Sequence, residues 1–167
     1  LPMGTMLFVS AALFLRINAE RPLVPKTHKH RMFEILEHTA DIGFRARGRT
    51  LEELFESAAE ALVSIAMEVE EVEPRERYPI EAQGEDREAL LVNWLNEVLY
   101  LHDGRRIAMR RFRVLEAGEG RARGEALGEP FDPARHHAKL IVKAVTYHQL
   151  RVVEDAAGWS ADVYLDI

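Results

Sequence analysis

The sequence predicts an α+β fold with two amphipathic helices and several strands joined in hairpins. Two segments carry apolar residues at the i, i+3, i+4 spacing of a helix that buries one face. Thr50 and Asp86 stand at their starts as capping residues, and Glu53 completes a capping-box pattern with Thr50. The other apolar segments are short and bounded by turn residues, as in β-hairpins. This order favours α+β over a doubly wound α/β fold.

The expected elements follow from these local patterns. The first helix starts at Thr50, and its buried stripe is Leu51, Leu54, Phe55, Ala58, Leu62, Ile65 and Ala66. The second runs from Asp86 to near His102 and is followed by a tight turn at Asp103-Gly104. A loop is expected at 128–133, with turns at 117–120 and 155–158. We expect strands at 33–38, 42–47, 78–82, 107–115, 121–127, 139–147, 150–153 and 159–166, although 139–147 is also compatible with a helix.

Composition limits the class of protein. The 167 residues are 47% hydrophobic and 30% charged, which is typical of a folded domain and not of a disordered chain. The absence of cysteine excludes disulfides and thiolate metal sites, and it suits a reducing cytoplasm. The net charge of −6 argues against a dedicated nucleic-acid binder. Seven arginines cluster on one predicted hairpin, at positions 105, 106, 110, 111, 113, 121 and 123. We therefore interpret them as a strand face exposed to solvent. The alternatives are contact with RNA phosphates or with an acidic partner surface.

Residues 1–31 differ from the rest of the chain. They carry five Lys or Arg against one Glu, and their apolar run at 6–15 is shorter than the roughly 20 residues that span a bilayer. We interpret 1–31 as a leader and linker outside the fold, and 32–167 as the domain, with Met32 as its natural start.

A polar motif, His38-Thr39-Ala40-Asp41, interrupts the first two strands. An ionised carboxylate beside a core needs a partner, and such conflicts with local stability are typical of functional sites. The alternative is an ordinary turn, which Thr and Asp form readily. The residues alone leave both interpretations open.

The end of the sequence offers a second acidic group. Asp166 is followed by Ile167, whose α-carboxylate adds a negative charge next to a strand that buries Val163 and Leu165. Two adjacent carboxylates in a partly desolvated place repel each other, and a cation relieves that repulsion. With Asp41 they would form an all-oxygen ligand set, which suits Ca²⁺ or Mg²⁺ better than zinc. The alternative is a frayed terminus.

Three separated segments resemble the archease family: EHTADIGFRARGRTLEELFESAAEAL, then KAVTYHQL, then the terminal YLDI. The resemblance covers 32–167. It implies an open sheet packed with helices, in which one strand-helix-strand-strand module is inserted into another. It assigns Asp41, Asp166 and Ile167 as metal ligands, for Ca²⁺ first and Mg²⁺ second. The same motifs supply candidates for holding those ligands or contacting a partner: His38, Thr39, Lys143, Thr146 and His148.

The resemblance also implies a function. Archeases are accessory proteins, not enzymes, that promote guanylylation and multiple turnover of the RtcB-type RNA ligase in tRNA splicing. Contact with tRNA would then be indirect, the location cytoplasmic, and no membrane involved. One alternative is a metal-dependent hydrolase using Asp41, Asp166 and His38. Another is a chaperone-like binding module, which would need an exposed apolar patch larger than a few hundred Å². The adjacent pair His136-His137 predicts no zinc site, because neighbouring strand residues face opposite sides.

Overall fold

A computed structural model describes residues 32–37 and 42–167. Their elements in chain order are β1 (Phe33–Glu37), β2 (Ile42–Gly48), α1 (Leu51–Ala66), β3 (Glu76–Gln83), α2 (Arg87–Leu99), β4 (Ile107–Gly118), β5 (Arg121–Pro130), β6 (Ala144–Asp155) and β7 (Gly158–Asp166). All strand pairs are antiparallel. They form a four-stranded sheet, β1-β2-β7-β6, and a three-stranded sheet, β3-β5-β4. Neither helix in these ranges is long and apolar enough to cross a bilayer.

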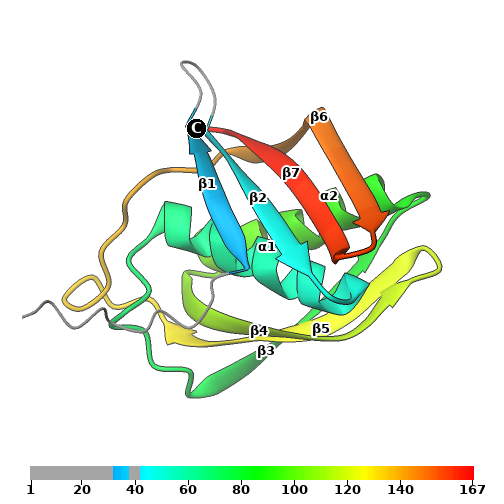
Figure 1. Ribbon diagram of the computed structural model, residues 1–167. Helices are drawn as coiled ribbons and strands as arrows, with labels where there is room; N and C mark the ends of the chain where they lie inside the picture. The colour runs from blue at the N-terminus through cyan, green and yellow to red at the C-terminus, as the bar shows by residue number, and fades with distance from the viewer. Residues whose placement is uncertain (1–31, 38–41) are drawn as a thin grey trace, which may run out of the picture.

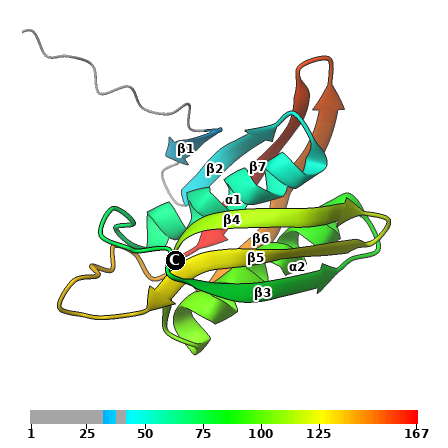
Figure 2. The same cartoon turned by 90° about the horizontal axis from the view of Figure 1, so that it is seen from below.

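The two helices lie between the two sheets (Figures 1 and 2). Helix α1 contacts β2 of one sheet and β4 of the other, and α2 contacts β3 and β6 in the same way. Twelve of the sixteen residues of α1 are therefore buried, including Ser57 and Ser64. The expectation of a single buried stripe was too narrow, because this helix has a sheet on each side. The α+β class and the two helices are confirmed.

The chain is organised as one module inside another. The outer module consists of β2, α1, β6 and β7, and the inner module of β3, α2, β4 and β5. In each module the last of the three strands lies between the first and the second, giving the orders β2-β7-β6 and β3-β5-β4. The nested strand-helix-strand-strand arrangement implied by the resemblance is present, and both modules have the same topology.

Trp94 connects the layers at the centre of the molecule. It is fully buried, its indole Nε1 donates to the Phe55 carbonyl at 3.2 Å, and its ring tilts against the Phe55 ring with centroids 6.2 Å apart. Gly124 of β5 leaves space for it, since a Cβ there would lie 3.0 Å from the indole and 2.3 Å from the Arg113 carbonyl. The two helices and the inner sheet therefore pack around one aromatic pair.

The local signals at the helix starts and in the first hairpin of the inner module are confirmed. The Thr50 hydroxyl accepts from the Glu53 N–H at 3.2 Å, and the Asp86 carboxylate accepts from the Ala89 N–H at 2.7 Å. Glu53 reaches back to the main-chain N–H of Arg49 at 2.8 Å, one residue earlier than a capping box requires. The β4–β5 turn places Glu119 and Gly120 at positive φ, as a two-residue hairpin requires.

Three expectations about the elements were wrong. After α2 the chain makes a π-helical turn, Tyr100–Gly104, closed by Arg105 N–H to Tyr100 O, instead of a tight turn at Asp103-Gly104. The expected loop at 128–133 begins later, because strand β5 continues to Pro130 against β3 and β4. The expected strands 139–147 and 150–153 are one strand, β6, with an irregularity between Thr146 and Arg151. Residues 139–143 are outside any strand or helix, because their main chain bonds to the end of α1 and to Asp166 instead.

Carboxylates from the helices cover exposed edges of both sheets. Glu56 of α1 accepts from the Val114 N–H of edge strand β4 at 2.8 Å, and Glu88 of α2 accepts from the Val152 N–H of edge strand β6 at 3.0 Å. Unpaired edge N–H groups invite pairing with other chains, so this capping protects the edges. Burial raises the pKa of Glu56 above its ordinary value, while the Val114 N–H opposes that rise.

These contacts predict different effects for two Glu56 variants. Glu56→Ala leaves the Val114 N–H without its acceptor, which should lower the free energy of unfolding by about 1 kcal/mol. Glu56→Gln keeps an acceptor oxygen and removes the cost of a half-buried charge, so at pH 7 its stability should equal or exceed that of the wild type. Urea denaturation of the three proteins measures both differences. Equal losses in the two variants would contradict the proposed edge contact.

Candidate functional site

The three segments that carry the family resemblance meet at one corner of the four-stranded sheet. The start of β2 pairs with the end of β7 through Ile42 and Leu165, and the start of β6 pairs there through Ala144 and Asp166. Figure 1 shows the end of the sequence at this corner. We call Ile42, Ala144, Asp166 and Ile167 the chain-end corner. Residues separated by more than 100 positions in the sequence are thus neighbours in space.

Tyr164 packs the three segments together beside this corner. A Cβ on Gly43 would lie 2.9 Å from the Tyr164 ring, so the ring needs a glycine on the neighbouring strand. On the other side, the His148 ring meets Tyr164 edge-on with centroids 5.9 Å apart. His148 belongs to the irregular part of β6, where Gln149 has a positive φ of 52°. The glycine of the first motif and the histidine of the second therefore both serve to position Tyr164 of the third.

Lys143 holds the end of β7. Its main-chain N–H donates to the Asp166 carbonyl at 2.8 Å, and its ammonium donates to a main-chain oxygen of Ile167 at 3.0 Å. Val163 and Leu165 are buried as expected. Asp166 and Ile167 are exposed, however, so the chain end is less desolvated than the sequence led us to expect. The buried strand ends one residue before Asp166.

The remaining candidate residues are His38, Thr39, Asp41 and Thr146. His38, Thr39 and Asp41 lie outside the described residues; Ile42, to which Asp41 is bonded, pairs with the residue before Asp166. The Thr146 hydroxyl donates to the Tyr164 carbonyl at 3.1 Å, which ties β6 to β7. Within 32–37 and 42–167 no three His, Asp or Glu side chains are grouped closely enough to hold a metal ion.

The inner module has a corresponding corner, with a buried acid that the sequence analysis missed. Glu129 lies one residue beyond the Glu76–Gly128 pair, as Asp166 lies one residue beyond the Ile42–Leu165 pair. Its carboxylate is only 5% exposed and accepts three hydrogen bonds. The donors are the Glu73 N–H at 2.8 Å, Arg135 at 2.7 Å and His136 Nε2 at 3.2 Å. These bonds lower the pKa of Glu129 to about 2, the Glu73 N–H contributing most.

The contacts of His136 fix its tautomer. Its Nδ1 accepts from the Asp132 N–H at 2.9 Å, so the ring proton is on Nε2 and points at Glu129. His136 is 2% exposed, whereas His137 is exposed and outside any strand. No zinc site was predicted at this pair, although the reason given, opposite faces of a strand, does not apply. In the sequence, Glu129 precedes Pro130 within a segment predicted to be a loop, so no sequence pattern predicted this buried cluster.

The two corners differ in the partners of their acidic side chains. In the inner module the protein itself supplies the cationic and N–H partners of the acid. At the chain-end corner the Asp166 side chain makes no hydrogen bond or ion pair with any described residue, and Lys143 is the cation beside it. Within the described ranges, the Asp166 carboxylate is therefore an exposed acid without a side-chain partner.

The seven hairpin arginines are all exposed, in agreement with a solvated strand face. Several are already occupied: Arg121 pairs with Glu116 at 2.8 Å, and Arg123 with Glu81 at 3.2 Å. Arg110 donates to the main chain of Glu70 and Val72.

Comparison with known proteins places this geometry in a family. The model of the archease protein family matches residues 33–167. The chain belongs to the archease family. The archease of Pyrococcus furiosus is 44% identical over 141 residues, which are 82% of this chain and 99% of that protein. The archease of Methanosarcina barkeri is 40% identical over 82% of this chain and 97% of its own length.

Solved structures agree with the archease fold. The solution structure of Methanobacterium thermoautotrophicum protein 1598 superposes with a TM-score of 0.72 and 36% sequence identity, covering 82% of this chain and 99% of that one. A crystal structure from Thermotoga maritima, described as an archease and possible chaperone, gives a TM-score of 0.55 at 22% identity and supports the fold alone. It covers 80% of this chain and 96% of its own.

Proposed function

We propose that this protein is an accessory activator of an RtcB-type RNA ligase, promoting guanylylation and multiple turnover of that enzyme without catalysing a reaction itself. Membership of the archease family carries the proposal. The meeting of the three motif segments at the chain-end corner supports it, because a function shared along those motifs needs one common location. Recognition of the tRNA substrate is then indirect, through the ligase, and the protein acts in the cytoplasm.

The corner also offers a surface for a protein partner. The connection 139–143 ends there, and its side chains Leu140 and Ile141 are 40% and 77% exposed. Tyr147 in β6 and Ile167 are exposed as well. Protein interfaces typically combine large apolar side chains at the centre with polar groups at the rim, and this corner offers both kinds of group. We infer that the ligase docks over this corner, with Asp166 within the contact.

The metal proposal rests on the chemistry of the donors. Asp41, Asp166 and the α-carboxylate of Ile167 are hard oxygen donors, which fit Ca²⁺ or Mg²⁺. Lys143 disfavours a metal ion at this place, because its ammonium already contacts a main-chain oxygen of Ile167. A cation binding here would have to compete with it or displace it. When bound, the ion would supply positive charge to a partner's anionic groups. His38 and Thr39 stand next to Asp41 in the sequence as candidates for orienting its carboxylate.

A guanylylation assay of the matching ligase tests the proposal. Wild-type protein should increase both the rate of guanylylation and the number of turnovers. Asp41→Ala and Asp166→Asn should each abolish the stimulation while leaving the circular dichroism spectrum unchanged, because neither removes a described packing contact. Asp155→Asn is the matched control, since this exposed aspartate lies at the opposite end of β6 and accepts a turn N–H that asparagine also accommodates.

Two outcomes would contradict it. Stimulation at the wild-type rate by both corner variants would remove the carboxylates from the mechanism. Hydrolysis of small phosphoesters by the protein alone, lost in Asp166→Asn, would assign the corner to a metal-dependent hydrolase instead.

A further inference from the structure

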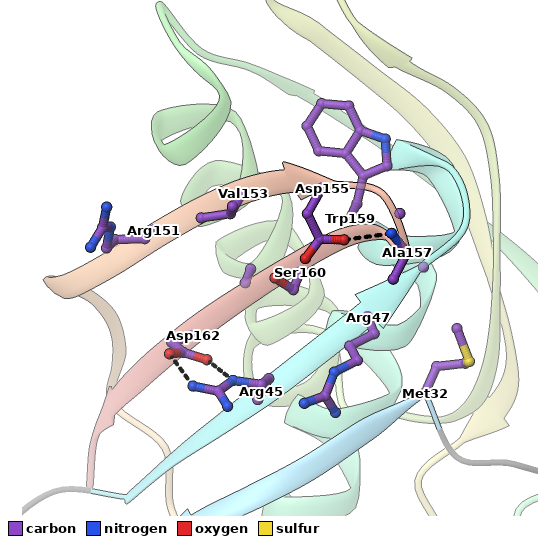
Figure 3. Close-up of a pocket in the computed structure, with 13 residues that line it drawn as sticks. Met32, Arg45, Arg47, Arg151, Val153, Asp155, Ala157, Trp159, Ser160 and Asp162 are labelled. Atoms are coloured by element: carbon purple, nitrogen blue, oxygen red, sulfur yellow. Dashed lines mark hydrogen bonds and ion pairs between the residues drawn. The ribbon is translucent and has the colours of Figure 1, made fainter.

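The outer face of the four-stranded sheet, on the side away from the helices, has a hollow of about 540 Å³ (Figure 3). Alternation along the strands places its lining residues. Phe44 and Ala46 of β2 are fully buried against the helices, so Arg45 and Arg47 project from the opposite face. Strand β6 adds Arg151, and strand β7 adds Ser160 and Asp162. Asp155 of β6 lines it as well, so three arginines and two aspartates are its charged described residues. The hollow is thus an arginine-rich surface with a positive excess on a protein of net charge −6.

One row of residues across β2, β7 and β6 carries three charged side chains of the hollow. Asp162 lies in register with Arg45 on one side and Arg151 on the other. Among the described residues, the side-chain hydrogen bonds to its carboxylate come from Arg45, through Nε at 2.5 Å and Nη2 at 2.7 Å (Figure 3). The Arg151 side chain is exposed and makes no hydrogen bond or ion pair with any residue in the described ranges. Arg151 therefore adds a cation without a described acidic partner to the same face of the sheet as the Arg45–Asp162 pair.

The neighbouring row adds a third cation. Arg47 lies opposite Ser160, its side chain is 49% exposed, and its Nη2 lies 3.2 Å from the Glu34 carboxylate of β1. Glu34 is also 3.6 Å from Arg45, so the two arginines share one acid. The guanidinium groups consequently keep free N–H donors directed at solvent, in the planar geometry that binds phosphate oxygens in pairs.

The spacing of these cations indicates what they bind. Arg45 and Arg151 stand on strands two positions apart, roughly 10 Å at the usual strand separation, so an occupant that reaches both carries several anionic groups along its length. Trp159 turns its ring away from the hollow (Figure 3) and packs against the core under Arg87, whose Cζ lies 4.7 Å from the ring centre. Among the described residues, no aromatic ring therefore faces the hollow for a base to stack on. Met32 and Val153 are its exposed large apolar residues, at 38% and 42%.

We propose that this arginine-rich face binds the phosphate backbone of a single-stranded polynucleotide without reading its sequence. Two or three phosphate contacts predict weak binding, with a logarithmic salt dependence of about −0.7 per contact. The proposal does not rest on the activation of a ligase, since the face is distinct from the chain-end corner and is tested with the purified protein alone.

Fluorescence anisotropy with a labelled oligouridylate at low salt provides the test. Arg47→Glu and Arg151→Glu should each weaken binding by about tenfold, because each replaces an attraction with a repulsion. Arg151→Lys should retain most of the affinity. Arg111→Glu is the matched control, an exposed arginine on β4 of the other sheet, and should change affinity less than about twofold, as expected for a charge far from the bound strand. An abasic strand of the same length should bind as well as oligouridylate.

Several results would overturn the proposal. Absence of wild-type binding at low salt would do so, as would an equal loss in Arg111→Glu, which would indicate nonspecific attraction. An acidic peptide of equal charge that binds more tightly than the oligonucleotide would assign the face to a protein partner. Circular dichroism of each variant separates loss of binding from loss of fold.

Discussion

If the α-carboxylate of Ile167 is a metal ligand as proposed, extending the chain beyond Ile167 should weaken the binding of Ca²⁺ and Mg²⁺ by about tenfold or more. A peptide bond converts the α-carboxylate into a neutral carbonyl, so one of three proposed negative ligands is lost, and the affinity of oxygen-ligand sites depends on their charge. Asp166→Asn should have the same effect without changing the backbone. An extension at the N-terminus should have none.

Replacing Lys143 should change the affinity for metal ions in the opposite direction. Its ammonium contacts an oxygen of Ile167 at 3.0 Å and so competes with a cation for that group. Lys143→Gln should therefore tighten metal binding, whereas Asp166→Asn weakens it. Calorimetric titration of both ions into the wild type, the extended protein and the two variants measures these changes. Equal affinities in all four would exclude the end of the chain from the site.

Glu129→Ala should lower the free energy of unfolding by about 3 kcal/mol at neutral pH. Removing one member of a buried ion pair leaves the other without compensation. Here Arg135 is 37% exposed and regains some hydration, which keeps the loss at the lower end of the range for buried pairs. For a domain of this size the melting temperature should fall by roughly 10 °C. Glu154→Gln, at an exposed glutamate of β6, is the matched control and should change it little.

The pH dependence of the Glu129 contribution follows from its lowered pKa. The pKa is about 2 in the folded protein, against an ordinary value of 4.5. The folded state therefore favours the ionised form, and the stabilisation is complete above about pH 4.5 and declines as the pH falls toward 2. Denaturation curves should show a large difference between wild type and Glu129→Ala at pH 6 and a smaller one at pH 3. A difference independent of pH would show that the charge of Glu129 contributes nothing.

The sequence predicted features that depend on neighbouring residues. Thr50 and Asp86 were recognisable as caps because the N–H groups they bind lie three residues away. The burial of Val163 and Leu165 followed from alternation along one strand. The capping role of Glu56 could not be predicted, since its partner Val114 is 58 residues distant. The second sheet that covers α1 could not be predicted either, because its strands belong to the inserted module.

The errors at the candidate site have the same origin. The β-branched residues of 139–147 indicated a strand, but the N–H groups of Lys139 and Leu140 bond to the Ala66 carbonyl at the end of α1. Glu129 appeared to belong to a loop because its partners, Glu73 and His136, are assembled only by folding. The described parts of the three archease motifs meet at the chain-end corner, whereas the exposure of Asp166 depends on where the buried strand ends.

The nesting of the two modules has a consequence for how the protein is made. The inner module is one continuous segment from β3 to β5, and all its strands are available once Pro130 has been synthesised. The outer module cannot close then, because β2 pairs with β7, and the Arg45–Asp162 bond joins residues 117 positions apart. Until the last strand leaves the ribosome, one edge of β2 lacks its partner and α1 lacks part of its cover. The nascent chain therefore exposes these unpaired surfaces to aggregation during the interval between the synthesis of Pro130 and that of β7.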